Sequence, residues 1–249
     1  MPLESPYLLL FIALAGSVQG TVGFGFGLVA MSTLPLWLGI KESVPVVALL
    51  CLVVNIALIW RLRHHLTLPR LGPMLLGGLI GVPIGVTLFV NMNADLLMMA
   101  LGVALIGVAA QQARSGATVA SHGAISPAWG GVAGLASGVL GGAFNTGGPP
   151  VVMYVGMQRW SKEHTVSTLQ VFLLFTSLLQ VGLFTLRGTI GTPQLFLAAK
   201  LMVPTLVGVL VGQLFFRHID QDRFRRLLLG AISLLGLSLL YKGVIATLG

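Results

Sequence analysis

Charged residues are scarce in this chain. Only 8% of its 249 residues are charged, whereas 56% are hydrophobic, and the mean hydropathy is +0.98. In soluble domains about a quarter of the residues are charged. The longest polar stretch here, residues 111–126, is too short to fold alone. Long apolar runs cross membranes as helices. The composition therefore predicts an all-α polytopic membrane protein and excludes an ordinary soluble domain.

The sequence also lacks the usual features of enzymes and metal sites. Cys51 is the only cysteine, so an intramolecular disulfide and a cysteine-based metal cluster are excluded. There is no phosphate-binding glycine loop ending in Lys-Ser/Thr and no His-Glu-x-x-His helix. Ser137 resembles the nucleophile of an intramembrane protease, but all five histidines are expected in loops, so none can act as its base. We expect no enzymatic activity, no cofactor and no bound metal.

The net charge of +8 is carried by basic residues in short loops between apolar runs. A basic surface can bind nucleic acid, but this distribution is the positive-inside pattern of membrane proteins. We therefore expect the lipid bilayer, and not nucleic acid, to surround this chain. The sequence leaves the oligomeric state open, including a homo-oligomer.

Apolar runs alternate with short loops in two successive series. The first predicted repeat, residues 1–112, has an interrupted segment at 8–40 and helices at 43–60, 71–90 and 96–110. Residues 113–126 form a connector. The second repeat, 127–249, has an interrupted segment at 127–157 and helices at 165–186, 194–216 and 227–245. Each repeat thus combines one broken segment with three transmembrane helices.

The two series are related in sequence. One constant offset matches Gly16, Gly20, Gly23 and Phe26 to Gly134, Gly138, Gly141 and Phe144. Both sets lie in apolar segments, and residues 134–150 are too rich in Gly and Pro for an ordinary helix interior. Paired interruptions at corresponding positions of two repeats are the best sequence indication of a transporter's binding site.

The loop charges distinguish two topologies. If all eight apolar runs cross the membrane, six basic residues face one side and seven the other, which is no bias. If the broken segments are re-entrant, one side carries ten: Arg61, Arg63, Arg70, Arg114, Arg159, Lys162, Arg217, Arg223, Arg225 and Arg226. The other side then carries Lys41, Arg187 and Lys242. The positive-inside rule favours this second arrangement, in which the repeats are inverted and both termini lie outside.

We expect the substrate site at the two interruptions. Unwound backbone in a membrane is tolerated only against protein or a water-filled cavity, and a helix restarting there points the positive end of its dipole inward. Neutral donors at two such helix starts suit a small oxyanion. The candidate binding residues are Gln19, Thr21, Gly23 and Gly25 in the first repeat and Ser137, Asn145, Thr146, Gly147, Gly148 and Pro149 in the second.

Some of these residues have a second explanation. The glycines also suit close helix packing or a kink, and a buried Asn145 also suits an unwound carbonyl that needs a donor. Lys200 is the one basic residue within an apolar run. It either attracts the anion or extends to the membrane interface.

A stripe of small residues marks the predicted helix at 71–90. Gly77, Gly81 and Gly85 recur at four-residue spacing and therefore lie on one face. Such a stripe predicts a neighbouring helix whose backbone approaches closely. Because no Asp or Glu lies in the middle of an apolar run, we expect no carboxylate proton relay.

The chain resembles the sulfite exporter TauE/SafE family, also described as the toluene-sulfonate uptake permease family. The resemblance covers nearly all of the chain and is carried by residues 16–27, Pro35, residues 134–150, Gly208, Gly212 and residues 223–226. It implies a multi-pass permease of the bacterial cytoplasmic membrane whose substrates are sulfite, sulfoacetate or other organosulfonates. The stretch 143–148 departs from the more purely glycine-rich sequence of many relatives, which bears on the substrate.

We therefore expect a secondary transporter, an exporter, of a small sulfur-containing anion. Two inverted repeats would give alternating access to a site at the paired breaks. Three alternatives remain open from the sequence: a passive anion channel, a permease for a different small anion, and a membrane-embedded partner subunit without transport of its own.

Overall fold

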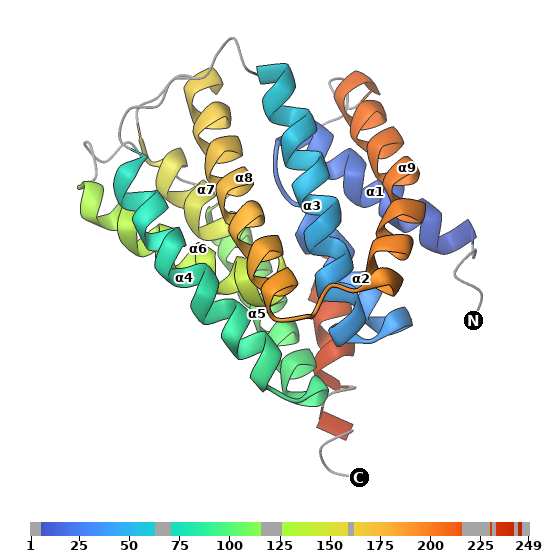
Figure 1. The fold of residues 1–249 in the computed structure, drawn as a ribbon. Helices are drawn as coiled ribbons and strands as arrows, with labels where there is room; N and C mark the ends of the chain where they lie inside the picture. Colours follow the sequence, from blue (N-terminus) through green and yellow to red (C-terminus); the bar gives the residue numbers. More distant parts are fainter. Residues whose placement is uncertain are drawn as a thin grey trace.

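The computed structural model describes residues 6–62, 71–115, 126–158, 162–215, 230, 233–241 and 244–245. These residues are helical apart from short turns, and none of them forms a strand. Within these described ranges, five helices are long and apolar enough to cross a membrane: Ile40–Trp60, Gly72–Asn91, Ala94–Gln111, His164–Leu186 and Thr192–Leu214. The chain is therefore an all-α polytopic membrane protein, as its composition predicts (Figure 1).

The first interrupted segment consists of two helices, α1 (Pro6–Val22) and α2 (Phe26–Leu38). In Figure 1, α1 rises to the turn at residues 23–25 and α2 descends from it. Gly23 and Gly25 have φ angles of 86° and 106°, which favour glycine. The interruption expected within residues 8–40 therefore lies at these three residues. The helices α3 (Ile40–Leu62), α4 (Gly72–Asn91) and α5 (Ala94–Ser115) follow.

The second interrupted segment consists of α6 (Pro127–Phe144) and α7 (Gly148–Gly156), separated by residues 145–147. The glycine register pairs Gly23 with Gly141, but Gly141 lies inside α6, so this break comes about one turn later than the register indicates. The helices α8 (Lys162–Leu186) and α9 (Thr192–Phe215) follow. In the last predicted helix, 227–245, residues 230, 233–241 and 244–245 are described, and they are helical.

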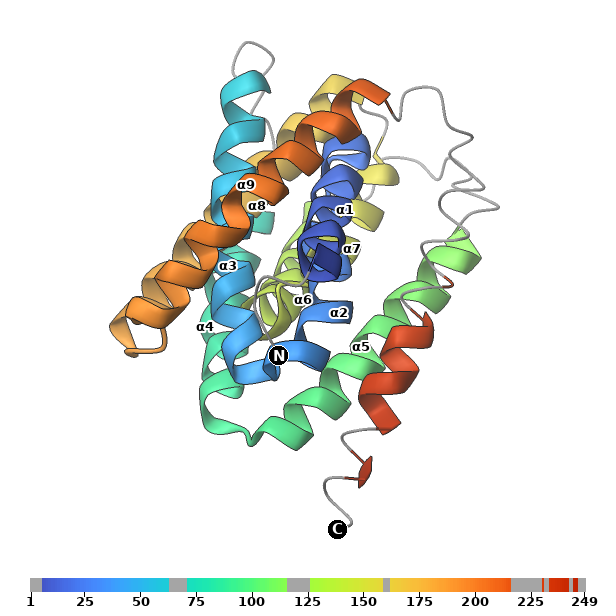
Figure 2. The ribbon, with the colours of Figure 1, turned by 90° about the vertical axis from the view of Figure 1, so that its right-hand side faces the viewer.

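The closest helix pairs join an early element of one predicted repeat to a late element of the other. α1 packs on α9, and α6 packs on α4. The central helices α3 and α8 pack on each other, and each also contacts the other's neighbour, α9 or α4. Figure 1 shows that α3 runs upward and α8 downward, and Figure 2 shows α9 crossing in front of α3 and α8. The two halves are thus interlocked.

Glycines make these pairings close. A Cβ atom at Gly77, Gly81 or Gly85 of α4 would fall on a backbone carbonyl of α6. The stripe of small residues at 77–85 therefore packs directly on a helix backbone, as predicted.

The pairing of α1 with α9 is built in the same way. A Cβ atom at Gly16 or Gly20 would fall on a carbonyl of α9, and one at Gly208 or Gly212 would fall on a carbonyl of α1. Because there is no hydrophobic driving force between helices in lipid, such close van der Waals contact stabilises their association.

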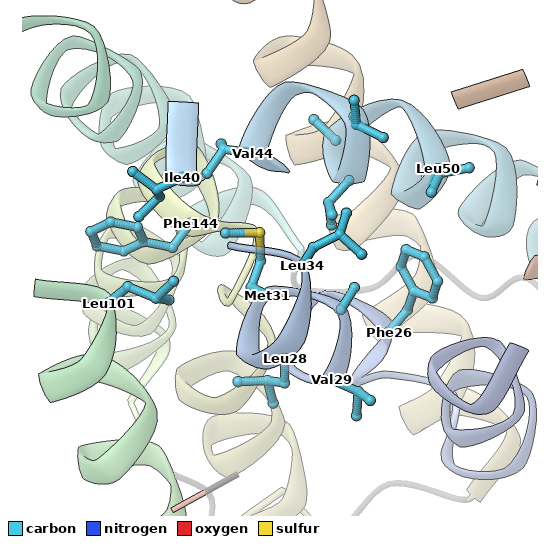
Figure 3. Packing of buried hydrophobic residues seen from close by; sticks show 14 of the residues in the cluster. Phe26, Leu28, Val29, Met31, Leu34, Ile40, Val44, Leu50, Leu101 and Phe144 are labelled. Atoms are coloured by element: carbon cyan, nitrogen blue, oxygen red, sulfur yellow. The ribbon is translucent and has the colours of Figure 1, made fainter. Parts of the chain in front are cut away.

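The short helix α2 is buried on every side. All of its residues from Phe26 to Pro35 are buried, which is typical of an apolar helix in a protein core. Figure 3 shows its side chains against residues of three other helices: Ile40 and Val44 of α3, Leu101 of α5 and Phe144 of α6. This packing holds the first break at a fixed position in the molecule.

One sequence expectation about the loops is wrong. His164 lies in the first turn of α8, which begins at Lys162, and not in a loop. The other four histidines lie outside the described residues.

Candidate functional site

Both interruptions border one cavity of about 50 Å³. A cavity needs roughly 10–15 Å³ to hold one water molecule, so this one accommodates a few waters or one small ion. Its lining comes from the first break, α3, the second break and α8: Gln19, Phe24, Gly25, Gly27, Leu28, Cys51, Asn55, Gly141, Asn145, Gly147, Gly148, Leu173, Thr176, Ser177 and Gln180.

The cavity lies beside the middle of two candidate membrane spans. Cys51 is central in the span Ile40–Trp60 and Thr176 is central in the span His164–Leu186, whereas Asn55 lies nearer the end of its span. Substrate sites of transporters with broken helices occupy the same depth.

No lining residue carries a charge. The polar lining consists of amides and hydroxyls, which donate hydrogen bonds: Gln19, Asn55, Asn145, Thr176, Ser177 and Gln180. Among the described residues, no three His, Cys, Asp or Glu side chains are grouped to hold a metal ion. The cavity therefore has the chemistry to bind a small anion through neutral donors.

At the first break, the start of α2 opens onto the cavity. Its N-cap residue, Gly25, has no side chain to cap the helix. The Phe26 N–H group instead donates to Gln19 Oε1 over 2.9 Å. The next residues, Gly27 and Leu28, line the cavity, and N–H groups in a first turn have no partner inside their own helix.

A chain of hydrogen bonds leads from this helix start to the second half. Gln19 Nε2 donates to Asn55 Oδ1 over 3.1 Å, and Asn55 Nδ2 donates to Ser177 Oγ over 2.9 Å. The chain thus joins α1, α3 and α8. Each amide uses one N–H group in it, so a second N–H of Gln19 and of Asn55 remains for a ligand.

At the second break, Asn145 has a φ angle of 58°, a left-handed conformation that asparagine tolerates at a helix end. Its Nδ2 donates to Val44 O over 2.9 Å. Its Oδ1 is buried without a hydrogen-bond partner among the described residues. The donor that remains is the second N–H of Nδ2, beside the cavity that Asn145 lines, whereas the unpartnered Oδ1 is an acceptor.

Two glutamines of α8 hold the breaks in place. Gln180 Nε2 donates to the carbonyls of Gly141 and Gly142 at 2.9 and 3.2 Å, near the end of α6. Gln170 Nε2 donates to the carbonyl of Gly23 in the first break. Carbonyls freed by the interruptions thereby keep donors inside the membrane, as burial requires.

Five of the ten candidate binding residues line the cavity: Gln19, Gly25, Asn145, Gly147 and Gly148. The others lie beside the breaks. The Thr21 hydroxyl donates to carbonyls of Ser17 and Gly212 and so faces α9. Gly23 accepts from Gln170. Ser137 donates to the Gly147 carbonyl, and Thr146 donates to the Leu140 carbonyl over 3.4 Å. Pro149 is buried in the first turn of α7.

Lys200 lies on an exposed face of α9 and does not line the cavity. Its Nζ is 4.9 Å from the centre of the Phe196 ring, one turn earlier on the same helix. This is a cation–π arrangement at the surface of the bundle.

A family model described as "Sulfite exporter TauE/SafE" matches residues 8–239. The match spans nearly the whole chain, both breaks and every residue that lines the cavity. The chain belongs to the sulfite exporter TauE/SafE family. This TauE/SafE protein is therefore a multi-pass membrane transporter of sulfur-containing anions and belongs to a family of transporters, not enzymes. No curated protein and no solved structure matches the chain significantly.

Sequence reasoning missed part of the cavity of the TauE/SafE protein. Asn55, Ser177 and Gln180 line it but lie in helices that the sequence presents as ordinary spans. A signal was available: Asn55 is the only amide in its apolar run, and polar side chains in membrane helices usually contact other helices.

Proposed function

We propose that this TauE/SafE protein is a secondary transporter that exports a small sulfur-containing anion, such as sulfite or an organosulfonate, across the bacterial cytoplasmic membrane. One observation carries the proposal. An uncharged cavity lined by hydrogen-bond donors lies beside two candidate membrane spans, between the starts of two short helices. An anion there is stabilised by N–H groups and helix dipoles without a fixed positive charge.

The anion is bound by groups from both breaks. The first turn of α2 and the spare N–H groups of Gln19 and Asn55 provide donors on one side. On the other side, Asn145 and the start of α7 at Gly148 provide donors. A Cβ atom at Gly147 would fall on the Ser137 carbonyl of α6, so the absence of a side chain there keeps the second break compact.

Transport proceeds by alternating access between two inverted repeats, residues 1–112 and 127–249. Two helix pairs, α1 with α9 and α6 with α4, each join an early helix of one repeat to a later helix of the other, which supports an inverted relation between the repeats. The opposite directions of α3 and α8 support it as well (Figure 1). Rocking of one half against the other around a central site would expose the anion to each side in turn.

The test is uptake of labelled sulfite into proteoliposomes of the purified protein at imposed membrane potentials, with sulfoacetate, thiosulfate and sulfate as competitors. A carrier shows saturable uptake, competition and counterflow of labelled substrate. Non-saturating flux without counterflow would replace the carrier by a passive channel. Absence of uptake of all these anions would overturn the substrate assignment.

The membrane potential should drive export. Each charge on an outward-moving anion gains about 2.3 kcal/mol per 100 mV of inside-negative potential. We therefore expect export to fall when an ionophore abolishes the potential, and to be faster for divalent than for monovalent anions at the same concentration gradient. Rates that do not change with potential would contradict this driving force.

A further inference from the structure

The hydrogen-bond chain beside the cavity crosses from the first half of the protein to the second. It runs from the Phe26 N–H group to Gln19, from Gln19 to Asn55, and from Asn55 to Ser177. The three side chains are only 4%, 2% and 7% exposed. The bond from Asn55 to Ser177 is the one that joins α3 to α8, and its burial makes it count in their packing.

Gln19 occupies the place of an anion oxygen. Its Oε1 accepts a hydrogen bond from the first residue of α2, at the positive end of a helix dipole. The residue that precedes this helix is glycine and offers no competing cap. A neutral carbonyl is a weaker acceptor at this position than a charged oxygen.

We propose that Gln19, Asn55 and Ser177 form an occupancy-sensitive link between the two halves. An anion oxygen replaces Gln19 Oε1 at the Phe26 N–H group, and the displaced amide releases Asn55 and, through it, Ser177. Ser177 is then a positioning residue that acts through Asn55 and Gln19. This inference rests on the proposed function, because it requires an anion in the cavity.

The link explains how binding changes the contact between the halves. The two ends of the Gln19 amide are bonded to α2 and α3, so the side chain cannot leave α2 without disturbing Asn55. Asn55 is the donor to Ser177 across the interface between α3 and α8. Occupancy at the first break is thus transmitted to a contact between the halves.

Cys51 provides a readout that does not depend on transport. It is the only cysteine of the chain and lines the same cavity. Its alkylation rate with N-ethylmaleimide measures access to the cavity in the purified full-length protein. Sulfoacetate is the probe, because sulfite itself adds to maleimides, and its binding is checked separately by competition with labelled sulfite.

We expect sulfoacetate to raise the alkylation rate of Cys51 about tenfold in the native protein, the factor that corresponds to one net hydrogen bond. Ser177→Ala should react at the fast rate without anion and gain little from it. Ser177→Thr, which keeps the hydroxyl, should restore the slow rate and the response to anion. Ser32→Ala is the matched control, since the buried Ser32 hydroxyl donates to Val29 O of its own helix.

A second variant tests the link independently, in case Ser177→Ala does not fold. Gln19→Glu has nearly the same shape, but its carboxylate places a permanent anion at the start of α2 and cannot donate to Asn55 Oδ1. We expect fast alkylation of Cys51 without sulfoacetate and loss of sulfite uptake.

Two failures can be told apart. If sulfoacetate binds the native protein but leaves the alkylation rate of Cys51 unchanged or lowers it, the link is refuted and the transporter stands. The link is also refuted if folded Ser177→Ala reacts as slowly as Ser32→Ala. If no anion binds and no uptake occurs in the native protein, the proposed function fails, and the link fails with it.

Discussion

Asn145 combines two properties that substitutions can separate. Its backbone adopts a left-handed conformation, and its amide lies between Val44 O and the cavity. Glycine at this position keeps the conformation but removes the amide, whereas alanine removes the amide and also disfavours the conformation. The two variants therefore distinguish a ligand from a helix terminator.

We expect Asn145→Gly to raise the KM for labelled sulfite by about tenfold or more, because one hydrogen bond to a charged group is lost. Its stability in detergent should fall by only about 1 kcal/mol, because the hydrogen bond to Val44 O is lost as well. Asn145→Ala should show the same rise in KM and also lose about 1–2 kcal/mol of stability. A native KM for Asn145→Gly would show that the amide serves the fold alone.

Lys41 illustrates a basic residue with a structural contact. Its Nζ donates to Phe89 O over 2.6 Å and to Val90 O over 3.3 Å, at the end of α4. It also lies 4.9 Å from the centre of the Phe89 ring. A cation at the C-terminal end of a helix is favourable because of the helix dipole, so this lysine ties the start of α3 to the end of α4.

Among the elements, the pairing of α4 with α6 depends most on glycine. At Gly81 the backbone of α6 occupies the space of a Cβ atom, with the Gly138 Cα only 3.0 Å from it. A methyl group there must push apart two helices that also position the second break. The packing of α4 on α6 at Gly81 is thereby coupled to the geometry of the second break.

We expect Gly81→Ala to lower stability by about 1–3 kcal/mol, the usual range for overpacking, and to reduce sulfite uptake. Gly182→Ala is the matched control, because a Cβ at Gly182 of α8 meets no atom within 4 Å. That change should leave uptake intact and, by helix propensity, stabilise by up to about 1 kcal/mol. Thermal melting in detergent and uptake measure both effects, and equal behaviour of the variants would contradict the packing argument.

The elements could be predicted from the sequence further than the site could. Apolar runs and glycine clusters indicated the spans, the breaks and the close approach at Gly81, because those features depend on local composition. The position of the second break could not be read from the glycine register, since the turn falls at Asn145 and not at Gly141. The contact between Asn55 and Ser177 was missed because it joins residues 122 positions apart, and a lone amide in an apolar run does not indicate which residue is its partner.

For the whole molecule, the topology depends on whether the two broken segments cross the membrane or return to the side from which they enter. With re-entrant segments, residues 114 and 187 lie on opposite sides of the membrane. If all eight apolar runs cross, both residues lie on the same side. Labelling at this one pair of positions therefore distinguishes the two arrangements.

We expect single cysteines at these positions, in a Cys51→Ala background, to react differently with a membrane-impermeant maleimide. Arg187→Cys should be labelled from outside in intact cells. Arg114→Cys should be labelled only after the membrane is permeabilised, as the positive-inside rule requires. Labelling of both from outside would show eight crossings.

The packing of α1 on α9 also has a consequence for the synthesis and membrane insertion of the protein. The ribosome delivers α1 first, yet the glycine face of Gly16 and Gly20 fits a helix that is synthesised nearly 200 residues later. Until α9 arrives, this face must be sheltered by lipid or by the insertion machinery. The glycine face of the first helix is therefore covered almost last, and a chain terminated before α9 leaves that face uncovered.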